Sequence, residues 1–272
     1  MNIDYYNKLE MELINKEMDQ HYFDYSYGLF LFDNLIEDKN SECIVMFSGG
    51  YDSTLNILLL CELKKNGIIE NRIGTVTVEG FENEDKIKAE SEARENILKL
   101  ISEKYQFSDS EFHDYGVVSQ INLNVNDLYK RGFFLQELFI SNVVPFLPNK
   151  TNLITGFSKE SSSTILFNNL QKICDGIDQY CFNSKTKILA PLNSFSKKDI
   201  IKILLTNYKE FFDLSWTCQN PVIKKNEIKP CYKCVKCKEV SDALQALINK
   251  GINSEKKFNS LKNKVIESLN KK

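Results

Sequence analysis

The sequence predicts an α/β fold in which a mostly parallel sheet is covered by helices on both faces. Short apolar runs alternate repeatedly with longer segments of helical periodicity, as in strand–helix–strand units. The first run, CIVMF at 43–47, is continuous and partly β-branched, which is typical of a buried strand. The chain has 272 residues, of which 42% are hydrophobic and 26% charged, enough for a substantial core.

Five strands and five helices follow in order along the chain. The helix after the first strand ends in two lysines and Gly67, a common stop signal, and Ser196 is the expected N-cap of the last of the five helices. The third helix is interrupted near Pro145. The strands are expected at 43–47, 73–80, 110–118, 151–157 and 187–194. The helices are expected at 54–67, 83–105, 132–147, 161–177 and 195–208, with more helix from 238 onwards.

Three parts are expected along the chain. Residues 1–40 form an aromatic-rich extension that packs on the core and could serve a partner or dimer contact, 41–210 form the α/β domain, and 211–272 form a small C-terminal unit.

Charge and composition exclude several classes of function. The net charge of −2 gives no general attraction to nucleic acid or to anionic membranes. No apolar run approaches the roughly 20 residues of a membrane helix, and the N-terminus has no signal pattern. We therefore expect a cytoplasmic protein with no membrane partner and no nucleic-acid partner. His21 and His113, the two histidines, lie in unrelated contexts, so no Ser-His-Asp triad is expected.

The loop Ser48-Gly49-Gly50-Tyr51-Asp52-Ser53 follows the first predicted strand and opens a helix. Glycines allow close approach of the backbone to an anion, and the start of a helix supplies unpaired N–H groups. Ser48 and Ser53 add hydroxyl donors. The loop lacks the lysine of a Walker A motif and the spacing of a dinucleotide fingerprint. This pattern predicts a phosphate-binding loop.

SGGYDST resembles the SGGxDS signature of the PP-loop ATP pyrophosphatases, a family that splits ATP into AMP and pyrophosphate. The resemblance implies a Rossmann-like sheet of the adenine nucleotide α-hydrolase type, with ATP and Mg²⁺ at the loop. It implies that Ser48, Asp52 and Ser53 are catalytic, and it places Lys159 and Glu160, after the fourth strand, in the same site. The residues implied to bind the nucleotide are Phe47, Ser48, Gly49, Gly50, Tyr51, Asp52, Ser53, Thr54, Val78, Arg131 and Gly156.

Four of the eight cysteines lie within twenty residues, in the pattern C-x12-C-x2-C-x2-C. These are Cys218, Cys231, Cys234 and Cys237. In a cytosolic chain this spacing indicates a closed, structural zinc site, with an iron–sulfur cluster and unligated thiols as the alternatives. Six lysines crowd the cluster and are interpreted as compensating the thiolate charge: Lys224, Lys225, Lys229, Lys233, Lys236 and Lys238.

The loop and the cysteine cluster together resemble the QueC family of 7-cyano-7-deazaguanine synthases, over residues 43–247. The segment APLNSFSKKDIIKIL, the S-x-T-C start and CxxCxxC follow the family order. The resemblance implies adenylation of 7-carboxy-7-deazaguanine or a related acid, transfer to ammonia or another nitrogen nucleophile, and a homodimer. The chain departs from the family at VEGFENED, at KRGFF, where Arg131 is the nearest match, and at GFSKESSSTILFNN.

Several functions stay open. Within the adenylating class, the product is a nitrile, a conjugate with a protein or small-molecule amine in a modification or antiviral defence system, or an amide made as in NAD or GMP synthetases. The departures favour the protein conjugate over the nitrile. A tRNA-thiolating enzyme is disfavoured by the net charge. The alternative of another class is a zinc-ribbon module that binds nucleic acid or protein on an inactive PP-loop fold.

Overall fold

The fold was analysed in a computed structural model that describes residues 39–81, 83–122, 135–158, 164–180, 185–193 and 195–248. The extension 1–40 and the end of the chain therefore lie almost wholly outside the described residues. Among the described helices, none combines the length and the apolar character needed to cross a bilayer.

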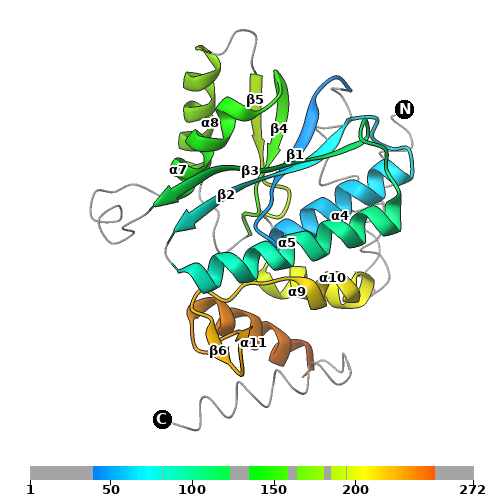
Figure 1. Cartoon of the computed structure of the whole chain (residues 1–272). Helices are drawn as coiled ribbons and strands as arrows, with labels where there is room; N and C mark the ends of the chain where they lie inside the picture. Colours follow the sequence, from blue (N-terminus) through cyan, green and yellow to red (C-terminus); the bar gives the residue numbers. More distant parts are fainter. Residues whose placement is uncertain are drawn as a thin grey trace.

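A five-stranded parallel sheet forms the centre of the molecule (Figure 1). Its strands are β1 (Glu42–Met46), β2 (Ile73–Phe81), β3 (Phe112–Asn122), β4 (Lys150–Ile154) and β5 (Lys185–Leu189). All five predicted strands are confirmed, although the fifth ends several residues earlier than expected. The predicted α/β class, with a parallel sheet and helices on both faces, is confirmed.

The helices that follow the strands also match the prediction closely. The first begins at Tyr51 rather than residue 54, because Gly50 is its N-cap, and the break near Pro145 is a short 3-10 turn, η1 (Val144–Phe146). Ser196 caps the last of the five, as predicted. These helices are α4 (Tyr51–Lys65), α5 (Glu84–Tyr105), α7 (Leu135–Val143), α8 (Thr164–Asp178) and α9 (Lys197–Asn207).

The strand order β3-β2-β1-β4-β5 places the first strand in the middle of the sheet. The chain runs outward through β2 and β3, then returns to the other side of β1 as β4. Loops at the carboxyl ends of β1 and β4 therefore diverge to opposite faces, which is where open α/β sheets bind ligands. The glycine loop follows β1 at this switch point.

Two apolar cores cover the two faces of the sheet. One contains residues of α4, α5, α9 and the C-terminal helix, and the other contains residues of α7 and α8 (Figure 1). Side chains of β1 alternate between them: Cys43 and Val45 lie in the first core and Ile44 in the second. The strand that carries the loop is thus buried on both faces.

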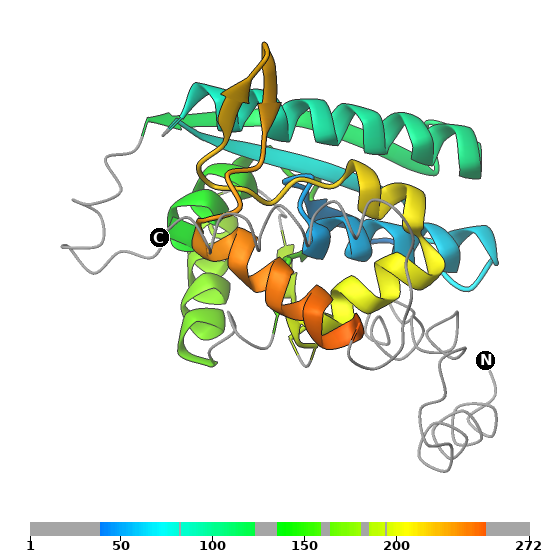
Figure 2. The same ribbon diagram turned by 90° about the horizontal axis from the view of Figure 1, so that it is seen from below.

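The C-terminal part adds α10 (Lys209–Leu214), a hairpin of β6 (Val222–Lys224) and β7 (Glu227–Lys229), and α11 (Val235–Ile248). Figure 2 shows α11 on the side of the molecule occupied by α9, and its residues Val240, Ala243 and Leu244 belong to the first core. In Figure 1 the hairpin lies beside α11, at the end of the molecule away from the sheet.

Candidate nucleotide pocket and cysteine site

The glycine loop is fixed at its base by the central strands. Phe47 is buried, its N–H donates to the carbonyl of Val76, and its own carbonyl accepts from the Thr77 hydroxyl at 2.7 Å. β2 therefore holds the end of β1 where the chain turns toward α4.

Hydrogen bonds within the loop draw its two serines together. Their hydroxyl oxygens are 3.2 Å apart, the N–H of Ser48 donates to Ser53 Oγ at 3.3 Å, and Ser53 Oγ donates to the carbonyl of Gly50 at 3.1 Å. The N–H of Gly50 donates to Ser48 Oγ. Gly50 is the N-cap of α4 and has no side chain, so the first N–H groups of the helix have no side-chain cap and are available to an anion.

Two glycines are needed where neighbouring groups come close to the loop. Gly49 has φ +75°, and a Cβ there would lie 3.1 Å from Arg94 Cγ and 3.3 Å from the backbone of Glu90. Gly156, after β4, would place a Cβ 3.2 Å from that of Asp52. A side chain at either position would crowd the loop.

Asp52 forms an ion pair with Lys197, the first residue of α9. The lysine is buried and the aspartate half-buried. The aspartate predicted to be catalytic is thus neutralised by a lysine far along the chain.

A second ion pair lies beside the loop, between Arg94 of α5 and Glu79 of β2. Both side chains are buried, and Gln120 also donates to Glu79 at 3.0 Å. Val78, the expected adenine contact, precedes Glu79 at the end of β2 and packs against the second core. Its role in binding stays a prediction.

A cavity of about 280 Å³ opens on the loop, at the switch point between β1 and β4. It is lined by Met46, Ser48, Gly50, Asp52, Ser53, Gln136, Phe139, Ile140, Thr155, Gly156, Phe157 and Lys236. The structure therefore brings together the predicted residues Ser48, Gly50, Asp52, Ser53 and Gly156. Arg131, Lys159 and Glu160 lie outside the described residues.

The four cysteines of the C-terminal cluster converge, with all their sulfur atoms within 4.8 Å of one another. Cys218 Sγ is 3.5 Å from that of Cys231 and 4.0 Å from that of Cys234, and the sulfurs of Cys231 and Cys237 are 4.0 Å apart. Four thiolates about 2.3 Å from one tetrahedral ion would be roughly 3.8 Å apart. The donor set therefore fits a single metal ion.

Backbone N–H groups around the cluster favour the thiolate form. Cys231 N–H donates to Cys218 Sγ, and the N–H groups of Lys233 and Cys234 donate to Cys231 Sγ. The thiol of Cys237 also donates to Cys218, and this bond, followed by the backbone bonds, lowers the pKa of Cys218 to about 5. These hydrogen bonds therefore favour the thiolate of Cys218, the form that a metal ion binds.

The segment before Cys218 joins the cysteine site to the loop. The N–H of Trp216 donates to the carbonyl of Gly49 at 2.8 Å, and the Ser215 hydroxyl donates to that of Thr54 at 3.1 Å. The ring of Tyr51 stacks on Phe212 of α10 with centroids 4.8 Å apart. The back of the loop thus rests on the C-terminal part.

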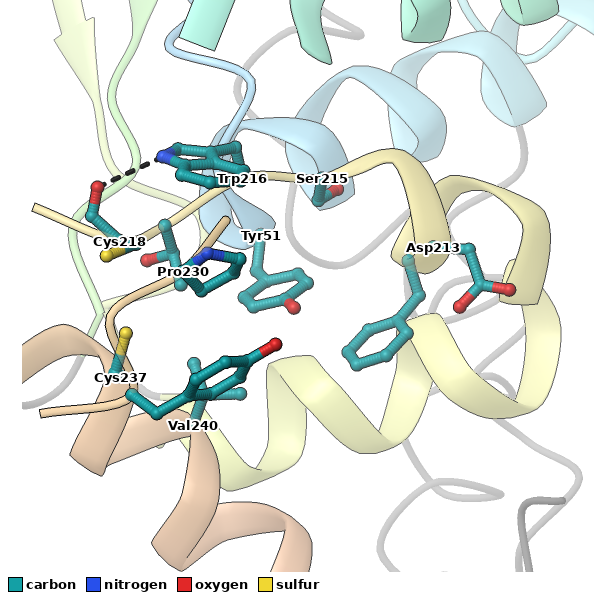
Figure 3. A pocket seen from close by; sticks show the side chains of 11 residues that line it. Tyr51, Asp213, Ser215, Trp216, Cys218, Pro230, Cys237 and Val240 are labelled. Atoms are coloured by element: carbon teal, nitrogen blue, oxygen red, sulfur yellow. Dashed lines mark hydrogen bonds between the residues drawn. The ribbon is translucent and has the colours of Figure 1, made fainter. Parts of the chain in front are cut away.

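A second cavity, of about 220 Å³, lies between this segment and the metal site (Figure 3). In Figure 3 the sulfurs of Cys218 and Cys237 lie at one end and the Asp213 carboxylate at the other. Tyr51 lines it, and burial, followed by the charge of Asp213, raises the pKa of this tyrosine. Tyr51 therefore stays neutral, and its ring packs against Phe212 behind the loop.

The sequence did not predict that three further residues lie at the loop. Lys197 carried a weak signal, because it follows the recognised cap Ser196, but nothing placed it beside Asp52. Trp216 carried none, since its contact is through the backbone. Lys236 was interpreted with its neighbours as charge compensation, although it alone among those six lysines lines the loop cavity.

Comparisons with known proteins give structural likeness only. No family model and no curated protein matches the sequence. The U34-tRNA thiolase NcsA from Methanococcus maripaludis, solved with its [4Fe-4S] cluster, is 16% identical with a TM-score of 0.43, over 90% of this chain and 78% of that one.

Two synthetases are also similar. The NH3-dependent NAD synthetase of Campylobacter jejuni is 14% identical with a TM-score of 0.39, over 92% of this chain and 94% of that one. The NAD+ synthetase of Burkholderia pseudomallei is 11% identical with a TM-score of 0.32, over 96% and 95%. At these identities and scores, the function must be argued from the residues of this chain.

Proposed function

We propose that the chain is an ATP-dependent adenylating enzyme that activates a carboxylic acid and passes the acyl group to a nitrogen nucleophile. One observation carries the proposal: the uncapped start of α4, the two loop serines and Gly156 face one cavity at the switch point of the sheet. This arrangement suits the phosphates of a nucleotide, because N–H groups, hydroxyls and the helix dipole all favour an anion there.

The residues have separate tasks in the proposed reaction. The loop N–H groups and the hydroxyls of Ser48 and Ser53 hold the β- and γ-phosphates and stabilise the pyrophosphate as it leaves, with the Ser53 hydroxyl turning from the Gly50 carbonyl to a phosphate oxygen. An oxygen of the acid attacks the α-phosphorus, the bond to pyrophosphate breaks, and the acyl adenylate forms. The amine then attacks the acyl carbon and AMP leaves. Mg²⁺, when bound, would neutralise phosphate charge.

The proposed acid is 7-carboxy-7-deazaguanine or a related ring acid, by the resemblance of the loop and cysteine pattern to the QueC family. The acceptor is ammonia or, as the departures from that family favour, an amine on a protein in a modification or defence system. For the cysteine site we propose zinc in a structural role, because four thiolates leave no open position for chemistry.

The test is turnover of ATP labelled at the α-phosphate, with Mg²⁺, with ammonia supplied or left out, and with a panel of carboxylic acids that includes 7-carboxy-7-deazaguanine. We expect AMP only when an acid is present, and the mass of the product would separate amide, nitrile and stalled adenylate. Ser53→Ala should lower AMP formation at least tenfold by removing a phosphate donor. Its matched control is Ser141→Ala on α7, whose hydroxyl bonds to Leu138. Absence of AMP and pyrophosphate with every acid would refute the proposal.

A further inference from the structure

The loop cavity presents a charge problem if it holds a polyphosphate. Among its described lining residues, Asp52 is the acidic one and Lys236 the basic one. Lys197 is paired with Asp52, and Arg94, beside the loop, is paired with buried Glu79. N–H groups, hydroxyls and one bound Mg²⁺ would still leave part of the negative charge of a triphosphate uncompensated. Lys236 is the described cation in position to compensate it.

Lys236 occupies an unusual place for a lysine. It is the second residue of α11, where the helix dipole disfavours a positive side chain. It lies between Cys234 and Cys237, so two of the four cysteines fix its backbone from both sides. Its side chain is about one-third exposed and pairs with Glu239 at 3.0 Å, a partly exposed i,i+3 pair that a phosphate can displace.

We propose that Lys236 is a phosphate-binding residue of the nucleotide pocket, and that the cysteine site exists in this chain to place it there. The metal site and the nucleotide site then act as one unit, with the metal fixing the turn that carries the lysine. This inference rests on the proposed nucleotide site but assigns a task that the loop motif does not contain.

The α11 helix supplies the rigidity that this role needs. Its residues Val240, Ala243, Leu244 and Leu247 are buried in the core shared with α4 and α9. Cys237 is also buried, and Lys238 N–H donates to the carbonyl of Cys234, which closes the turn. Because the packed helix and the metal turn already hold the backbone of Lys236, phosphate binding has to order only its side chain.

The first experiment measures the dissociation constants of ATP and of inorganic pyrophosphate by calorimetry. Lys236→Gln should weaken both by about 10- to 100-fold, as expected for loss of a charged donor. Lys236→Arg should keep most of the affinity. The matched control is Lys238→Gln, an exposed lysine two positions along that does not line the cavity. Metal content and melting temperature should stay unchanged in all three.

A swap variant tests whether position, rather than charge, matters. Val235→Lys combined with Lys236→Val keeps the composition, the net charge and all four cysteines, but moves the lysine to the exposed position 235. It should lose as much affinity as Lys236→Gln. If the swap or Lys236→Gln binds ATP and pyrophosphate as tightly as the unchanged protein, the inference is wrong while the proposed function stands. If the unchanged protein binds neither, both are wrong.

A second experiment tests the coupling of the two sites. By thermodynamic reciprocity, a metal that orders Lys236 must bind more tightly when ATP is present. The full-length protein, as purified with its metal, is equilibrated with a competing chelator, and the retained metal is measured with and without saturating ATP. ATP should increase retention in the unchanged protein and in Lys238→Gln, but not in Lys236→Gln. Equal ATP effects in all three, or none in any, would overturn the coupling.

Discussion

At Gly49 the loop combines two constraints, a positive φ and the close approach of α5. Its φ is +75° and its missing Cβ leaves room for Arg94 and Glu90 of α5. Gly67 offers a matched comparison, since its φ is +68° but a Cβ there would meet nothing within 4 Å. The two positions share the backbone strain and differ in the contact.

We therefore predict different costs for alanine at these two glycines. Gly67→Ala should lower the free energy of unfolding by about 1 kcal/mol, the cost of a left-handed alanine. Gly49→Ala should cost about 2–4 kcal/mol, since the backbone of α5 must also move. Urea unfolding of both variants measures the difference. If both variants lose the same free energy of unfolding, α5 moves to accept the new Cβ at no cost.

Lys197 determines whether Asp52 is compatible with phosphate. Lys197→Gln should raise the dissociation constant of ATP about tenfold or more, because it leaves an unpaired carboxylate beside the phosphates. Removing that charge in the double variant Asp52→Asn with Lys197→Gln should recover affinity. Calorimetry on the four proteins of this cycle gives the coupling. If the losses of ATP affinity in the two single variants add up in the double variant, Lys197 contacts ATP itself instead of acting through Asp52.

At the scale of elements, the start of α9 positions that lysine. The hydroxyl of Ser196 accepts from the N–H of Asp199, and the carboxylate of Asp199 accepts from the N–H of Ser196, a complete capping box. Lys197 is the next residue, so the cap fixes the direction in which its side chain leaves the helix.

Ser196→Ala should lower the free energy of unfolding by about 1 kcal/mol and weaken ATP binding two- to threefold. Thr206→Ala, at the other end of α9, removes a hydroxyl that bonds only within the helix and is the control. Thermal unfolding and ATP calorimetry measure both quantities. If ATP binding is unchanged while stability falls, the cap supports α9 without orienting Lys197.

The cysteine element should contain one metal ion per chain. Elemental analysis should find about one zinc, because four converging sulfurs make one tetrahedral site. Cys231→Ser should abolish the zinc and lower the melting temperature. Cys174→Ala, which alters a buried cysteine of α8 far from the cluster in sequence, should retain it. If the analysis finds iron and sulfide instead of zinc, the cysteines hold an iron–sulfur cluster and the assignment of zinc is wrong.

At the scale of the whole molecule, several buried or half-buried thiols and phenols hold their protons more tightly than in the unfolded chain. Burial raises the pKa of the Cys174 thiol to about 12, and burial is also the largest cause of the raised pKa of Tyr51, Tyr105 and Tyr115. In the unfolded chain these groups lose their protons near pH 9 to 10. Between those pH values and the higher folded values, the folded state binds more protons, so stability must fall as pH rises.

We predict that the urea midpoint decreases from about pH 8.5 to 10.5, and that Cys174→Ala makes this decrease shallower. The same buried thiol should resist alkylation in the folded protein at neutral pH, because little thiolate is present. A midpoint that is flat over this range would show that these groups ionise without unfolding.

The sequence predicted the sheet and the loop because both depend on local signals. The apolar run CIVMF predicts a buried strand, and SGGYDS predicts the phosphate-binding loop that follows it. The hairpin β6–β7 was missed because its turn residues, Lys225 and Asn226, both adopt positive φ without the glycine that usually marks such a turn. The contacts of Lys197, Trp216 and Lys236 with the loop depend on tertiary packing, which periodicity and spacing do not encode.

The partners of the loop come late in the chain. Lys197, Trp216 and Lys236 all follow the last strand of the sheet, whereas the loop follows the first. As the chain leaves the ribosome, the loop therefore emerges well before the lysine that pairs with its aspartate. The same late segment supplies α9 and α11, which complete the core on one face of the sheet, so that synthesis of the C-terminal part sets the moment at which the protein can act.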